Sequence, residues 1–153
     1  TFRLMAHAAL QAVRARLPGK PPFDPNQRML TPSPNLSPVE HLADPVIRLR
    51  LAGRYGADVT ELLAAACPGE LAPIGDSAAL WAELRWAARA EGVAHLDDLL
   101  LRRVRLGLLL PRGGLDCIEL IRPVVQPELG WDDEQWAREV EAYARLWERC
   151  YSV

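Results

Sequence analysis

The concentration of proline between residues 18 and 45 sets the tightest limit on what this chain can fold into. This segment holds eight of the chain's thirteen prolines. Each proline fixes its own φ, lacks a backbone N–H and disfavours helix in the residue before it. We therefore expect an extended connector rather than a helix or an interior strand. A connector of this length is uncommon inside a compact domain, so it predicts that the chain is divided into two parts.

Helical patterns flank the connector on both sides. Residues 1–17 repeat apolar side chains with the 3.6-residue period, and Pro18-Gly19 ends the pattern. After the connector, helices are predicted at 45–55, 59–67, 77–91, 96–105, 116–129 and from 132 onward. The predicted fold class is all-α, a bundle of about five helices plus a leading helix on a proline-rich strap.

The start of the helix at Pro45 has clear local signals. Asp44 can accept a hydrogen bond as the N-cap, and proline is favoured at the first helical position. Val46, Leu49 and Gly53 fall on one face of this helix. A comparable start is predicted at Asp132, where an N-cap acid precedes a hydrophobic stripe.

The overall charge argues against a nucleic-acid-binding protein. The formal net charge is −2, so no general basic field attracts phosphates. The run Arg102-Arg103-Val104-Arg105 is short and follows two aspartates, so nucleic-acid binding through it remains the weakest hypothesis. No uncharged apolar stretch approaches the roughly 18–20 residues that a membrane span requires.

The three cysteines indicate reduced thiols rather than a disulfide framework or a zinc site. Cys67, Cys117 and Cys150 are widely spaced, and no CxxC pair occurs. We therefore expect a cytoplasmic protein. The chain also begins at Thr1 directly within a helical pattern, so we expect it to be part of a longer protein.

The most highly charged stretch is the predicted helical hairpin at 82–106, which turns at Gly92. A cluster of carboxylates here could suggest acid–base catalysis. Charges on a helical hairpin more commonly pair with one another, so we favour a structural ion-pair network. We expect that network to comprise Glu83, Glu91, Arg102, Arg103 and Arg105.

No catalytic or metal site is complete in these residues. His41 and His95 lack a serine, cysteine or carboxylate at any diagnostic spacing. The sequence also lacks the GxSxG, HExxH, P-loop and GxGxxG motifs. We therefore predict neither catalytic residues nor metal ligands in this chain.

Four stretches, in order, carry a family resemblance. Thr1-Phe-Arg-Leu-Met-Ala6 resembles the end of a Gly-Gly-Lys-x-Thr-Thr-Tyr-Arg-x-Met-Ala segment, with Phe in place of Tyr. Leu51-Ala-Gly-Arg-Tyr-Gly56 resembles an Arg-Tyr-Gly helix end, and Leu129-Gly-Trp-Asp132 the entry to a last helix. The most specific signature is Ala82-Glu to Ala-Glu91 followed by Leu96-x-Asp-x-Leu-x-Arg-Arg-x-Arg-Leu106. Together they resemble the C-terminal part of FAD-dependent glycerol-3-phosphate dehydrogenases and the related glycerophosphate oxidases.

The resemblance implies a C-terminal helical cap domain of a flavoenzyme that oxidises sn-glycerol 3-phosphate to dihydroxyacetone phosphate. Residues 1–17 would be the last helix of an upstream FAD-binding domain, 18–45 a connector and 46–153 the cap domain. Thr1 is the one residue carried over as flavin-adjacent. FAD would otherwise be bound upstream, and this chain alone would be inactive.

The resemblance also implies partners and a location. The upstream FAD and substrate domain is the expected partner, a homo-oligomer is allowed, and electrons pass to quinone at the cytoplasmic face of the membrane or to oxygen. The alternative is an independent helical protein-interaction module that uses an exposed face of the 77–106 hairpin.

Overall fold

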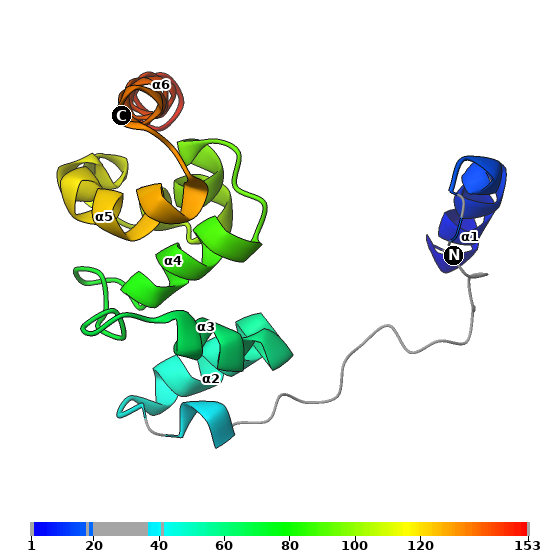
Figure 1. Cartoon of the computed structure of the whole chain (residues 1–153), viewed down its shortest axis with the longest axis horizontal. Coiled ribbons are helices and arrows are strands. Elements are labelled where there is room, and N and C mark those ends of the chain that lie inside the picture. Colours follow the sequence, from blue (N-terminus) through cyan, green and yellow to red (C-terminus); the bar gives the residue numbers. More distant parts are fainter. Residues whose placement is uncertain (1, 18, 20–36, 41, 153) are drawn as a thin grey trace. The chain divides into compact units, whose positions relative to one another are not determined.

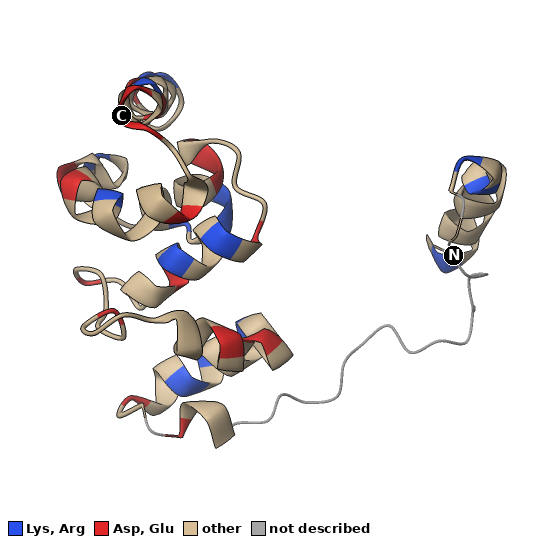
Figure 2. Ribbon diagram, in the orientation of Figure 1, with Lys and Arg blue, Asp and Glu red and all other residues tan. Residues whose placement is uncertain are grey.

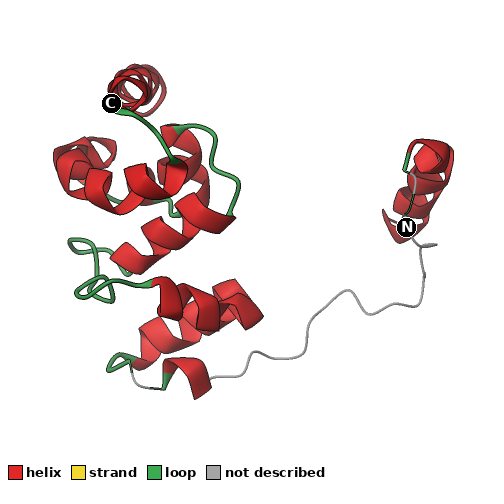
Figure 3. Cartoon of the chain, in the orientation of Figure 1, coloured by secondary structure: helices red, strands yellow, loops and turns green. Residues whose placement is uncertain are grey.

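The computed structural model describes residues 2–17, 19, 37–40 and 42–152. The chain divides into two compact units, residues 1–33 and 34–153. Within the described residues every regular element is a helix and no strand occurs (Figure 3). The all-α prediction is therefore confirmed, with one helix in the first unit and five α-helices in the second. Most of the predicted connector at 18–45 lies outside the described residues.

The first unit contains helix α1 (Phe2–Val13), which continues into a 3-10 turn at Arg14–Arg16. This is the expected leading helix, and it ends close to the predicted position. α1 buries none of its residues, and its apolar side chains Leu4 and Met5 are exposed.

The second unit contains the remaining helices (Figure 1). In chain order they are α2 (Pro45–Tyr55), α3 (Val59–Ala65), α4 (Trp81–Ala90), α5 (Ile118–Leu129) and α6 (Asp133–Tyr151). The segments between them include a π-helical turn at Asp98–Arg103 and 3-10 turns at Leu106–Leu108 and Pro111–Cys117.

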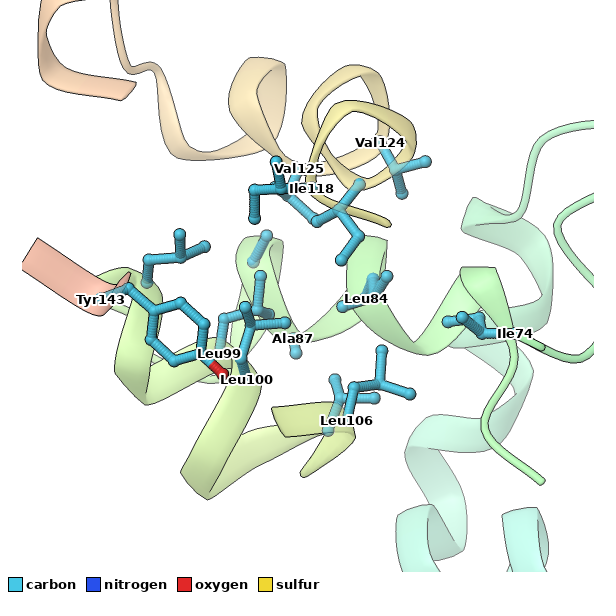
Figure 4. Close-up of a cluster of buried hydrophobic side chains, with 14 of the residues drawn as sticks. Ile74, Leu84, Ala87, Leu99, Leu100, Leu106, Ile118, Val124, Val125 and Tyr143 are labelled. Atoms are coloured by element: carbon cyan, nitrogen blue, oxygen red, sulfur yellow. The ribbon is translucent and has the colours of Figure 1, made fainter. Parts of the chain in front are cut away.

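Helix α4 lies at the centre of the second unit, between α3 and α5 (Figure 1). Ala82 and Trp86 are buried in a core shared with α2 and α3, which we call the α2–α3 core. Leu84 and Ala87 point into a second core with α5 and α6, the α5–α6 core (Figure 4). Because α4 is buried on two faces, it joins both cores into one unit.

Two close contacts hold the segment between Arg103 and α5 against α6. The buried Tyr143 hydroxyl donates to the carbonyl of Gly113 over 2.6 Å, and Trp147 Nε1 donates to the carbonyl of Gly107 over 3.3 Å. A Cβ at Gly107 would lie 2.3 Å from the Tyr143 oxygen, and one at Gly113 would lie 2.3 Å from Trp147. Both glycines therefore permit an approach that any other residue would obstruct.

Some of the helix starts predicted from the sequence agree with the structure, and one does not. Asp44 Oδ1 accepts from the amide of Val46 over 2.7 Å, and Asp132 Oδ1 accepts from the amide of Gln135 over 2.7 Å, so both predicted N-caps are confirmed. The predicted start of the third of these helices at residue 77 is wrong, because α4 begins at Trp81. The Ser77 hydroxyl instead donates to the carbonyl of Ile74 in the preceding turn.

The face of α2 formed by Val46, Leu49 and Gly53 does not enter the core. Val46 is 69% exposed and Leu49 is 66% exposed. Leu51 and Tyr55, four positions apart, enter the α2–α3 core instead. This short helix therefore carries apolar side chains on two faces. Among the described residues of this unit, only the face of Leu51 and Tyr55 is covered.

The central position of α4 predicts a large effect of truncating its buried face. Leu84→Ala should lower the free energy of unfolding by about 2–5 kcal/mol, because the fully buried side chain leaves a cavity in the α5–α6 core. Leu120→Ala is the matched control, since Leu120 is 61% exposed, and should change the free energy by no more than about 0.5 kcal/mol. Urea denaturation measures both, and equal effects would contradict the assigned packing.

Candidate functional site

The buried carboxylate of Glu83 is the strongest candidate for a chemically special group. Glu83 lies in the first turn of α4 and its side chain is 0% exposed. Arg50 on α2 approaches both carboxylate oxygens, with Nη1 to Oε1 at 2.8 Å and Nη2 to Oε2 at 2.5 Å. The Tyr55 hydroxyl donates to Oε1 over 2.9 Å, and the amide of Leu80 donates to Oε2 over 2.8 Å.

These four hydrogen bonds leave Glu83 without free acceptor capacity. A carboxylate has about four lone-pair positions, and here each oxygen accepts two donors. The hydrogen bond to Glu83 raises the pKa of Arg50. Burial, followed by the nearby Glu83 charge, raises the pKa of Tyr55. The Glu83 carboxylate therefore connects α2 to α4 and is not available for proton transfer to a substrate.

The ion pairs around the hairpin differ from the expected network. Glu83 is paired with Arg50, and Arg102 with Asp97 over 2.7 Å and Asp98 over 2.5 Å. The structure therefore does not bring Glu83 and Arg102 together. The carboxylate of Glu83 faces α2, whereas Arg102 sits beside the aspartates of its own helical turn.

The remaining members of that predicted network are placed separately. The backbone carbonyl of Arg103 accepts a hydrogen bond from the guanidinium of Arg54. Among the described residues, the side chains of Glu91, Arg103 and Arg105 form no ion pair. No local spacing could have indicated Arg50, which is 33 positions from Glu83.

A second charged cluster is centred on Arg85, on the other side of α4. Arg85 Nη2 lies 2.6 Å from Glu70 Oε1, and its Nη1 lies 2.6 Å from Glu128 Oε1. Arg89 also donates to Glu128, over 2.8 Å. The hydrogen bond from Arg85 lowers the pKa of Glu70, and the one from Arg89 lowers the pKa of Glu128. This cluster ties α4 to α5 and to the turn before α4.

His95 takes part in a structural pair rather than a catalytic one. Its Nδ1 lies 3.0 Å from Glu139 Oε1, and the other oxygen of Glu139 accepts from the amide of Leu96 over 3.0 Å. The hydrogen bond to Glu139 raises the pKa of His95. Glu139 therefore connects α6 to the start of the π-helical segment.

A shallow groove between α5 and α6 has a volume of about 440 Å³. Arg122 and Trp136 line it together with Asp133. The guanidinium of Arg122 is already engaged by Asp133 over 2.6 Å and by Gln126 over 2.8 Å. The groove therefore offers little free positive charge to an anionic substrate.

Other kinds of site receive no support from the described residues. They hold no group of three or more histidine, cysteine or carboxylate side chains able to bind a metal ion. No helix among them is both long enough and apolar enough to cross a membrane. Thr1, the residue expected beside a flavin, lies outside the described part of the chain.

Comparison with known proteins gives the family. A family model described as the C-terminal domain of alpha-glycerophosphate oxidase matches residues 31–136, more than half of the chain. The chain belongs to the alpha-glycerophosphate oxidase C-terminal domain family. No solved structure matches this C-terminal domain.

This alpha-glycerophosphate oxidase C-terminal domain also has curated relatives. It is 35% identical to the glycerol-3-phosphate dehydrogenase of Mycobacterium leprae over 156 aligned positions, which cover 94% of this chain and 27% of that protein. It is 41% identical over 96 residues to glycerol-3-phosphate dehydrogenase 2 of Mycobacterium bovis and of Mycobacterium tuberculosis, covering 61% of this chain and 16% of theirs. The chain therefore spans less than a third of the length of these relatives, and the resemblance read from the sequence is confirmed.

The hydrogen bonds of Glu83 predict a large loss of folding stability when its charge is removed. Glu83→Gln should lower the free energy of unfolding by about 3 kcal/mol, because it leaves Arg50 without its buried counter-charge and places an amide donor against the surrounding donors. Glu141→Gln removes an exposed pair with Arg145 and should cost at most about 0.5 kcal/mol. Similar costs for both, measured by urea denaturation, would contradict a structural role for Glu83.

The Arg85 cluster predicts a dependence on pH. Because the pKa values of Glu70 and Glu128 are lowered on folding, their contribution is complete above the ordinary glutamate pKa of 4.5 and is lost as pH falls through the folded values. Arg85→Met should therefore destabilise strongly at pH 7 and progressively less below about pH 4.5. Denaturation from pH 7 to pH 3 measures the difference, with Arg145→Met as the exposed control. A constant difference for Arg85→Met would contradict the assignment.

Proposed function

We propose that this domain is the helical cap of an FAD-dependent glycerol-3-phosphate dehydrogenase that oxidises sn-glycerol 3-phosphate to dihydroxyacetone phosphate. The observation that carries the proposal is the family match over residues 31–136. The alignment with the Mycobacterium leprae dehydrogenase, which covers 94% of the chain, supports the same conclusion. An independent interaction module is not favoured, because such a module would not be expected to align along nearly its whole length with one enzyme.

In this proposal the domain itself performs no chemistry. The buried carboxylate of Glu83 accepts four internal donors, and Arg85 is held by two glutamates. The one pair of adjacent glycines, Gly113-Gly114, offers no cradle for a cofactor phosphate, because Trp147 packs directly over Gly113. The lack of a phosphate cradle at this glycine pair supports a flavin held by an upstream part of the parent protein.

The proposed division of the chain follows the same reasoning. Residues 1–17 would be the last helix of the FAD-binding domain, 18–45 the connector and 46–153 the cap domain. The division of the chain into units at residues 33 and 34 and the start of the family match at residue 31 support this arrangement. Thr1, which directly precedes α1 in the sequence, would lie beside the flavin, because a helix N-terminus favours negative charge.

The partners and location proposed for the parent protein come from the same family relationship. The upstream FAD and substrate domain of the same polypeptide is the main partner, and a homo-oligomer is allowed. The parent works in the cytoplasm, at the inner face of the membrane, and transfers electrons to quinone or to oxygen. The net charge of −2 supports the exclusion of nucleic acid as a partner.

The complete reading frame that contains this chain provides the test. The full-length protein should purify with bound FAD and reduce a quinone analogue when given glycerol 3-phosphate. The 153-residue chain should be colourless and inactive under the same conditions. A full-length protein without flavin, or a 153-residue chain that oxidises glycerol 3-phosphate alone, would contradict the proposal.

A further inference from the structure

The outer face of α2 is an apolar surface that none of the described residues of the second unit covers. We define it by Val46, Leu49 and Gly53, which lie at helical spacing. Val46 is 69% exposed, Leu49 is 66% exposed, and Gly53 is exposed as well. Large apolar side chains aligned on one helix face, rather than scattered singly, mark a surface that binds another protein segment.

Gly53 adds an independent reason to expect a partner. Glycine inside a helix is destabilising by about 1 kcal/mol relative to alanine. A Cβ at Gly53 would meet no atom within 4 Å, so no contact within the structure explains the glycine. Its absent side chain instead permits close approach of another backbone, in line with Val46 and Leu49. A lipid surface gains nothing from such a gap, because it would contact a larger apolar side chain more favourably.

The outer face of α2 is itself uncharged. The helix carries Arg48, Arg50 and Arg54 and no acidic residue (Figure 2). Arg50 is paired with Glu83 on α4, and Arg54 donates to the carbonyl of Arg103. The surface that covers the outer face is therefore expected to be apolar.

We propose that the outer face of α2 is the surface on which the upstream flavin-binding part of the same polypeptide packs. This inference rests on the proposed function, because it takes the chain to be the C-terminal part of a longer dehydrogenase. The chain spans 27% of its Mycobacterium leprae relative, so a large upstream part is available to cover the face. In the sequence, α2 is also the first α-helix after the connector.

The first test compares two leucines of similar exposure on different helices. Leu49→Asp and Leu120→Asp each replace a leucine that is more than 60% exposed. In the 153-residue chain both should leave the melting temperature within about 2 °C of the original. In the full-length protein Leu49→Asp should lower the temperature of flavin release by about 5 °C or more, because a carboxylate enters an apolar interface. Leu120→Asp should not change it.

The second test uses a substitution that should stabilise the 153-residue chain but not the full-length protein. Gly53→Ala should raise the melting temperature of the 153-residue chain by about 2–4 °C, because alanine favours helix and meets no obstruction. In the full-length protein the same methyl group would enter the interface, so the temperature of flavin release should fall or stay unchanged. An equal rise in both proteins would overturn the inference.

The outcomes separate this inference from the proposed function. A full-length protein that binds FAD and oxidises glycerol 3-phosphate, but responds identically to Leu49→Asp and Leu120→Asp, overturns the α2 surface and leaves the function intact. Absence of FAD and activity overturns both. Dissociation of a dimeric 153-residue chain by Leu49→Asp in light scattering, or loss of its binding to phosphatidylglycerol vesicles, assigns another occupant and also overturns the inference.

Discussion

The hydrogen-bonded pair of Glu83 and Arg50 is the interaction on which the second unit depends most. Removing a carboxylate from water costs several kcal/mol, and this cost is offset only when both oxygens find good donors. Here the guanidinium of Arg50, the Tyr55 hydroxyl and the Leu80 amide supply them. Arg50 belongs to α2 and Glu83 to α4. The hydrogen bonds that compensate the buried charge therefore also fix how these two helices pack.

The position of α4 extends this constraint to the rest of the unit. One face of α4 belongs to the α2–α3 core and the other to the α5–α6 core. Arg85, on the same helix, connects it to Glu128 on α5. Buried charge pairs and one shared helix therefore hold the two cores of this domain together.

The sequence predicted the features that depend on neighbouring residues. The all-α class, the N-caps at Asp44 and Asp132 and the start of the last helix all follow from local spacing and are confirmed. The Glu83–Arg50 pair lies on separate helices, and no period relates residues 33 positions apart. The outer face of α2 was also not recognised as exposed, because apolar spacing does not distinguish a core from a surface that another part of the protein covers.

The central claim is that α4 makes both cores one cooperative unit. Native-state hydrogen exchange of the 153-residue chain tests this most directly, because it measures the opening free energy of each amide. The account predicts that the most protected amides of α3, α4 and α5 open with the same free energy, and that Glu83→Gln lowers all of them together. An α2–α3 region that opens at a much lower free energy than α4 and α5, and alone responds to Glu83→Gln, would contradict it.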